Sequence, residues 1–115
     1  MKYYSEEETK ELRLALEDEV LSWPHIGTRK MYGCPCYKAN GRLFAFLVTN
    51  GLVITCLGEK DREKISRQRQ TSRFQAGKIT IPGWVRIPIQ DRGELTEIMP
   101  YVKKSYRSAL KKGED

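Results

Sequence analysis

Two cysteines separated by one proline, Cys34-Pro35-Cys36, are the first residues of the chain that could do chemistry. With Cys56 and the single histidine, His25, they make four side chains of the types that bind zinc. Zinc motifs usually place about two to four residues between paired ligands, and this spacing differs. We therefore predict no metal and no cofactor. A thiol or metal sensor built on Cys34, Cys36, Cys56 and His25 stays an alternative.

Two Asn-Gly pairs predict where the cysteines lie. Asn40-Gly41 and Asn50-Gly51 separate apolar runs and are typical of two-residue hairpin turns. Turns centred on them place Cys36, Ala45 and Cys56 in one row across three strands. Because neighbouring strands lie about 4.8 Å apart, the outer two would be about 10 Å apart, too far for a disulfide. We expect reduced thiols that fill space against a helix, unless a bulge beside the proline breaks this register.

Length and composition indicate one folded domain over residues 1–115, with 39% apolar and 31% charged residues. The longest purely apolar run, Leu43 to Val48, is far shorter than the roughly 18 residues of a membrane helix. Residues 1–8 lack the apolar segment of a signal peptide. The three cysteines are an odd number without disulfide-framework spacing, which favours a cytoplasmic location.

Apolar periodicity predicts an α+β domain. Helices are expected over residues 5–23, 59–70 and 91–110, and strands over 29–39, 42–49, 52–57, 78–81 and 84–88. Ser5 with Glu8 and Asp91 with Glu94 have the spacing of capping boxes, and Pro100 predicts a kink or a restart in the last helix. Strands in hairpins imply a two-layer fold, an antiparallel sheet with helices on one face, in the order α-β-β-β-α-β-β-α.

The strand over residues 42–49 is apolar on both faces. A two-layer domain covers only one face of its sheet with helices. We therefore expect the other, aromatic face to be buried in a symmetric homodimer. The residues predicted for that dimer face are Tyr37, Phe44, Phe46 and Val48.

Basic residues gather in a segment over residues 60–78: Lys60, Arg62, Lys64, Arg67, Arg69, Arg73 and Lys78. Interleaved carboxylates leave an excess of about four charges, which predicts a salt slope of only about −3.6 for duplex DNA. A solvated helix face explains the same pattern. The segment thus supports at most weak, non-specific binding to nucleic acid, with no pattern for base recognition.

Several short stretches resemble the TfoX N-terminal domain family. They are Lys30-Met31-Tyr32-Gly33, Cys36-Tyr37, Asn40 to Ala45, Trp84-Val85 with Pro88, and Met99-Pro100-Tyr101-Val102. The resemblance extends from about residue 16 to residue 110, with Tyr32 in place of the usual phenylalanine. It implies a secretion-chaperone-like topology and a stand-alone TfoX/Sxy-like protein without the family's C-terminal helical domain. The family's named members are regulators of competence development, and the family offers no catalytic residues to carry over.

No nucleophile and base stand in a recognisable spacing, so we predict that the chain is not an enzyme. We expect a non-enzymatic interaction module, a transcriptional or competence co-regulator that acts through a protein partner and not at a membrane. Weak binding of nucleic acid through residues 60–78, a thiol or metal sensor, and an unrecognised small enzyme are the alternatives.

Overall fold

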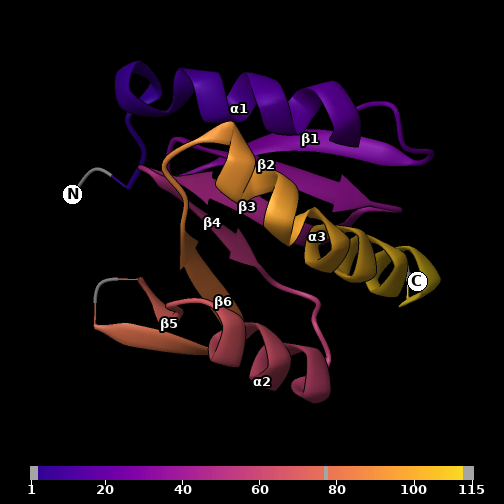
Figure 1. Ribbon diagram of the computed structural model, residues 1–115. Helices are drawn as coiled ribbons and strands as arrows, with labels where there is room; N and C mark the ends of the chain where they lie inside the picture. The colour runs from indigo at the N-terminus through magenta and orange to yellow at the C-terminus, as the bar shows by residue number, and fades with distance from the viewer. Residues whose placement is uncertain (1–2, 77, 113–115) are drawn as a thin grey trace.

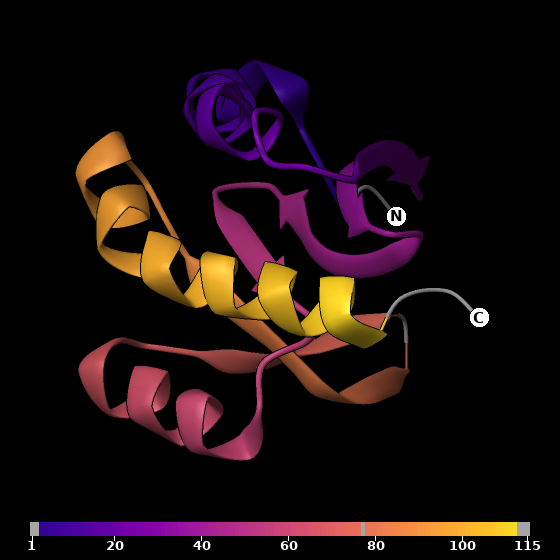
Figure 2. The ribbon, with the colours of Figure 1, turned by 90° about the vertical axis from the view of Figure 1, so that its right-hand side faces the viewer.

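The computed structural model describes residues 3–76 and 78–112 of the chain, and over these residues it has three helices and one six-stranded sheet (Figure 1). The elements are α1 (Glu6–Val20), β1 (Ile26–Met31), β2 (Cys34–Ala39), β3 (Arg42–Val48), β4 (Gly51–Ile54), α2 (Glu59–Gln68), β5 (Ser72–Ala76), β6 (Ile79–Pro88) and α3 (Arg92–Lys112). Every neighbouring pair of strands is antiparallel, in the order β1-β2-β3-β4-β6-β5. The helices pack on one side of the sheet (Figure 2), which confirms the predicted α+β class.

The first predicted strand, over residues 29–39, is in fact two strands. Tyr32 and Gly33 have positive φ angles of 52° and 80°, and they form a two-residue turn that pairs Met31 with Cys34. These angles suit the hairpin turns that match the twist of the strands. The observed order is therefore α-β-β-β-β-α-β-β-α, with one strand more than predicted.

The predicted row of cysteines is wrong. A register shift between Tyr37 and Lys38 leaves Phe44 as an extra residue in β3, so Cys36 pairs with Phe46. The next hairpin closes between Val48 and Gly51, one residue earlier than predicted, and β4 ends before Cys56. The bulge shifts the pairing of β2 with β3 by one residue, and the early turn shifts the pairing of β3 with β4 so that Ala45 pairs with Ile54. Cys36, Ala45 and Cys56 therefore do not form one row.

The other end of the sheet also differs from the prediction. Residues 72–76, expected as a loop under which Phe74 packs, form β5, although Phe74 is buried as predicted. The two short strands expected over 78–81 and 84–88 are the single strand β6. Pro82 and Gly83, which has a φ of 84°, lie within β6 opposite a register shift in β5. This irregular pairing lets β6 bend instead of ending.

The helix predictions are largely confirmed. Leu12, Leu16 and Val20 form the buried stripe of α1. Ser5 does not cap this helix with its side chain, and its N–H instead donates to the Thr49 hydroxyl at 2.9 Å. α3 begins as predicted, with the Glu94 N–H donating to the Asp91 carboxylate at 2.9 Å, and it continues through Pro100. No helix within the described residues has the length and apolar character needed to span a membrane.

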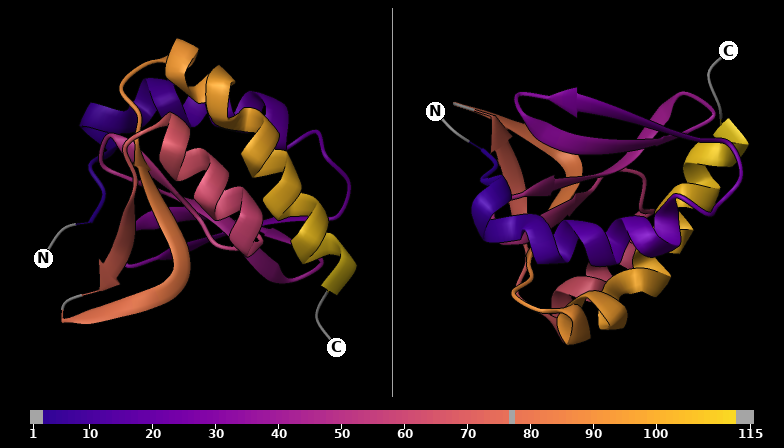
Figure 3. Two further views of the ribbon diagram at one scale, coloured as in Figure 1. Left: turned by 60° about the horizontal axis from the view of Figure 1, so that its bottom comes forward. Right: turned by 90° about the horizontal axis from the view of Figure 1, so that it is seen from above.

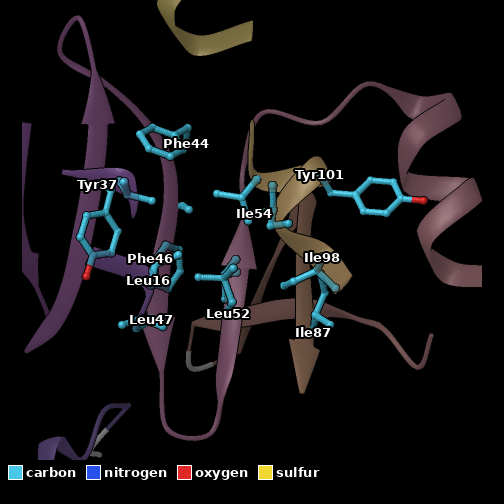
Figure 4. Packing of buried hydrophobic residues seen from close by; sticks show 14 of the residues in the cluster. Leu16, Tyr37, Phe44, Phe46, Leu47, Leu52, Ile54, Ile87, Ile98 and Tyr101 are labelled. Carbon is cyan, nitrogen blue, oxygen red and sulfur yellow. The ribbon is translucent and has the colours of Figure 1, made fainter. Parts of the chain in front are cut away.

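The core occupies both faces of the sheet. On the helix face, rows of paired residues such as Leu47 with Leu52, and Leu52 with Ile87, lie beneath α3, whose Ile98 is fully buried (Figure 4). On the opposite face, Phe46 makes edge-on contacts with the Phe74 ring at 5.1 Å and the Trp84 ring at 5.5 Å. The β5–β6 hairpin therefore covers the face of β3 that was expected to be open.

The predicted dimer face is wrong for this reason. Tyr37, Phe44, Phe46 and Val48 are each at most 1% exposed in the monomer. The bulge turns Phe44 toward Trp23 and Tyr106 on the helix side, and the hydroxyl of Tyr37 reaches α1. None of these four side chains is available to a second copy of the chain.

Candidate partner-binding cleft

The most exposed strand of the sheet is β1, at one edge (Figure 3). Among the described residues it pairs with β2 and with no other strand. Its four central residues, from Gly27 to Lys30, are exposed, so side chains on both of its faces reach solvent. A strand that contributes so little to the core is available for contacts with another molecule.

The pairing of β1 with β2 determines which backbone groups of β1 point toward the open edge. The Asn40 N–H donates to the His25 carbonyl at 3.1 Å, which makes these two a hydrogen-bonded pair. Bonded pairs alternate along an antiparallel ladder, so every second residue of β1 from there bonds to β2. The N–H and C=O groups of Ile26, Thr28 and Lys30 consequently point away from the sheet. They form a row that a further strand can bind.

A cleft of about 740 Å³ lies between α1 and the β1–β2 hairpin. Its sheet wall includes Thr28, Arg29 and Lys30 of β1, and its helix wall includes Arg13 and Glu17 of α1. The pairing of Thr28 with Tyr37, whose hydroxyl reaches α1, shows that Thr28 and Lys30 face the helix. Arg29 also lines the cleft, but its side chain points to the opposite face of the strand.

A closed hydrogen-bond network forms the helix wall. The Arg13 guanidinium binds the carboxylates of Glu6 at 2.8 Å and Glu17 at 2.9 Å. The hydroxyl of Tyr37 donates to Glu17 at 2.7 Å, and that of Tyr4 donates to Glu6 at 2.5 Å. These carboxylates are thus already paired within the chain.

The protonation states of the wall agree with this pairing. Hydrogen bonds from Arg13 and Tyr4 lower the pKa of Glu6 to about 2. Burial raises the pKa of Tyr37 above its ordinary value, and the hydrogen bond to Glu17 adds to that shift. Neither group exchanges a proton near neutral pH, as a general acid or base would have to.

The predicted metal candidates do not come together. Cys34 and Cys36 are buried, whereas His25 is exposed in the loop after α1. No group of three or more metal-binding side chains exists among residues 3–76 and 78–112. The Cys56 thiol donates to the Leu43 carbonyl at 3.2 Å. Burial raises the pKa of Cys34 to about 11, so its thiol is protonated and unreactive at neutral pH.

The basic segment over residues 60–78 presents fewer free cations on the surface than the sequence suggests, because two of its arginines are bound within the chain. Arg69 binds Glu94 and, at 2.5 Å, Glu97, which ties the end of α2 to α3. Arg62 donates to the Leu57 carbonyl at 2.6 Å. The segment's remaining exposed cations are Lys60, Lys64, Arg67, Arg73 and Lys78.

The sequence interpretation missed the cleft and the role of β1. One signal was present: no Asp or Glu occurs between Glu19 and Glu59, while the same stretch contains Arg29, Lys30, Lys38 and Arg42. An acid-free stretch that forms the edge of a sheet indicates a cationic surface.

Comparison of the chain with family models, curated proteins and solved structures finds no match. Membership of the TfoX N-terminal domain family therefore stays a prediction from the motifs.

Proposed function

We propose that the domain is a non-enzymatic interaction module that binds an extended segment of a partner protein as an additional strand on β1. The open edge of β1 is the observation that carries this proposal. Main-chain hydrogen bonds along such an edge supply affinity, and neighbouring pockets supply selectivity for alternate side chains. The cleft beside β1 gives one face of the added strand such a pocket.

The regularity of β1 supports the same proposal. Its six residues pair in sequence with β2 without a register shift, so the outer groups are evenly spaced. The strand has no proline and no bulge, two devices that commonly prevent pairing at an edge.

A role as a transcriptional or competence co-regulator is the biological part of the proposal, and the motif resemblance supports it. In that role the domain holds a partner and performs no reaction. We also propose a cytoplasmic location, because three unpaired cysteines suit a reducing compartment. A homodimer stays a prediction, and its interface would have to use residues other than the four buried ones.

The test uses a phage-displayed library of random peptides about ten residues long, enough to span one strand. Thr28→Pro removes an outward N–H without removing a bond to β2, whereas Thr28→Val keeps that N–H and a β-branched side chain. We expect selected peptides to bind the wild type and Thr28→Val but not Thr28→Pro. No enrichment, or peptides that bind all three proteins equally, would contradict the proposal. Circular dichroism establishes that Thr28→Pro is folded, and Lys30→Pro, which removes the next outward N–H, replaces it if it is not.

A second candidate is weak binding of nucleic acid through α2. Lys60, Lys64 and Arg67 follow one another at helical spacing and are exposed, so they share one face of α2. With so few cations we expect binding of a random duplex at low salt that is lost near physiological salt. Lys60→Ala together with Lys64→Ala should reduce it, and binding that survives both the substitutions and the salt would exclude this surface.

A further inference from the structure

The charge around β1 indicates what kind of segment it binds, an inference that rests on the proposed function. The stretch from residue 20 to residue 58 has no acidic residue. It forms β1, β2, β3 and β4, which make up one end of the sheet. A partner that pairs with β1 therefore meets strands whose own charges are all positive, beside the cleft that α1 lines with Glu6 and Glu17.

Arg29 and Lys30 are the cations on the strand itself. They are consecutive, so their side chains lie on opposite faces of β1, and both are exposed. Neither makes an ion pair within the part of the chain that the structure describes. Both cations are thus available to a ligand.

The carboxylates that line the cleft make no ion pair with these two cations. Glu6 and Glu17, across the cleft from Lys30, are bound by Arg13. On the other face, Arg29 pairs with Cys36, and the next residue of β2 on that face is the cation Lys38, which pairs with Gly27. Arg29 and Lys38 are close enough to the buried Cys36 thiol to oppose the rise in its pKa that burial causes. The far face therefore presents the uncompensated positive charge of Arg29 and Lys38. In the cleft, Lys30 is unpaired among the described residues and faces a helix wall in which Glu6 and Glu17 share the single cation Arg13.

We propose that the segment bound at β1 carries two adjacent acidic residues. Adjacent residues of a strand point to opposite faces, as Arg29 and Lys30 do. One carboxylate of the added strand then meets Lys30 in the cleft, and the other meets Arg29 on the far face. Opposite charges in cross-strand pairs stabilise a sheet, whereas like charges destabilise it, so the same geometry rejects a basic segment.

Three synthetic peptides test the proposal: Val-Thr-Glu-Glu-Thr-Val and its Gln-Gln and Lys-Lys counterparts. Fluorescence polarisation measures their binding at about 0.05 M and 0.15 M salt, where screening differs. We expect the Glu-Glu peptide to bind at least about tenfold more tightly than the Gln-Gln peptide at the lower salt, and the Lys-Lys peptide to bind least. Equal binding of all three would overturn the proposal.

Substitutions in the protein locate the effect. Arg29→Gln with Lys30→Gln should remove the preference for Glu-Glu, and Arg29→Glu with Lys30→Glu should transfer it to Lys-Lys. Arg42→Gln is the matched control, because Arg42 is an exposed cation of the same acid-free stretch on β3. Loss of the preference in the control alone would place the acidic segment elsewhere and overturn the assignment.

The proposed function and the charge proposal fail in different ways. Peptides that bind without regard to charge, yet lose binding in Thr28→Pro, would leave edge pairing intact and overturn the acidic signature. Binding that persists in Thr28→Pro would overturn edge pairing itself. A random single-stranded DNA that binds the protein through Arg29 and Lys30, and more tightly than the Glu-Glu peptide does, would overturn both edge pairing and the acidic signature in favour of nucleic acid.

Discussion

The two edge strands of the sheet, β1 and β5, differ in the regularity of their pairing. β1 pairs with β2 over six consecutive residues, whereas β5 is shorter and its pairing with β6 shifts between Arg73 and Gln75. At the β5 edge, Phe74 turns inward to meet Phe46, and the bent β6 contributes Trp84 to the same cluster. An irregular strand with an inward aromatic side chain is a poor template for a partner, and a regular exposed strand is a good one.

The two ends also differ in their ion pairs. At the β5 end, Arg69 binds Glu94 and Glu97, and Lys104 binds Asp61 at 3.0 Å, so ion pairs tie α2 to α3. Arg73 of β5 itself is exposed and makes no ion pair among the described residues. At the β1 end, Arg29 and Lys30 have no such partner among the described residues. The β5 end is thus held by inward aromatic packing and by ion pairs between its helices, whereas the β1 end has a regular strand with two unpaired cations among the described residues.

The largest expected effect comes from the β5 end. Phe46→Ala should lower the free energy of unfolding by about 3–5 kcal/mol, because it leaves a cavity between Phe74 and Trp84. Urea denaturation measures the loss. The matched control is Ile79→Thr on the same hairpin, where the side chain is 68% exposed and we expect a change within about 0.5 kcal/mol. Similar values for both variants would mean that the hairpin does not pack on β3.

A smaller effect is expected from the ion pairs that tie α2 to α3. Arg69→Met should destabilise the domain by about 1–2 kcal/mol, because two charge-assisted hydrogen bonds are lost at a side chain that is only 19% exposed. Arg67→Met serves as the control. Its ion pair with Glu63 is exposed and 3.7 Å long, so we expect a change within about 0.5 kcal/mol. A larger loss for Arg67→Met than for Arg69→Met would contradict this assignment.

The smallest effect concerns the helix wall of the cleft. The pKa of Glu6 is lowered from 4.5 to about 2 in the folded chain, so its contribution is present above pH 4.5 and is lost as the pH falls toward 2. We expect Glu6 to contribute less than about 1 kcal/mol to the free energy of unfolding, because its side chain is 49% exposed and solvent screens its ion pair with Arg13. Glu6→Gln should flatten this part of the pH profile. A profile with the same slope in the variant would assign the acid sensitivity to other groups.

Much of the fold could be predicted from local patterns. The stripe of Leu12, Leu16 and Val20 predicted α1, and the Asn40-Gly41 turn has the positive φ angles, 52° and 80°, that this pair favours. The turn at Tyr32-Gly33 was missed because a tyrosine with positive φ has no clear sequence signal. Gly33 alone was too weak a signal to divide the predicted strand over residues 29–39 into two.

The rest depended on tertiary packing. The bulge at Phe44 follows from its contacts with Trp23 and Tyr106, which come from distant parts of the chain. The cleft could not be predicted, because it depends on where α1 lies relative to β1. The cations of the candidate site, in contrast, were visible in the sequence as the acid-free stretch around Arg29 and Lys30.

Residue-resolved amide hydrogen exchange, with and without the Glu-Glu peptide, tests the central claim most directly. In the free chain we expect the amides of Gly27, Arg29 and Met31 to be protected by their bonds to β2, and those of Thr28 and Lys30 to exchange fast. The peptide should then protect Thr28 and Lys30. Amides of Thr28 and Lys30 that are already protected in the free chain, or that exchange equally fast at saturating peptide, would contradict an open edge that binds an added strand.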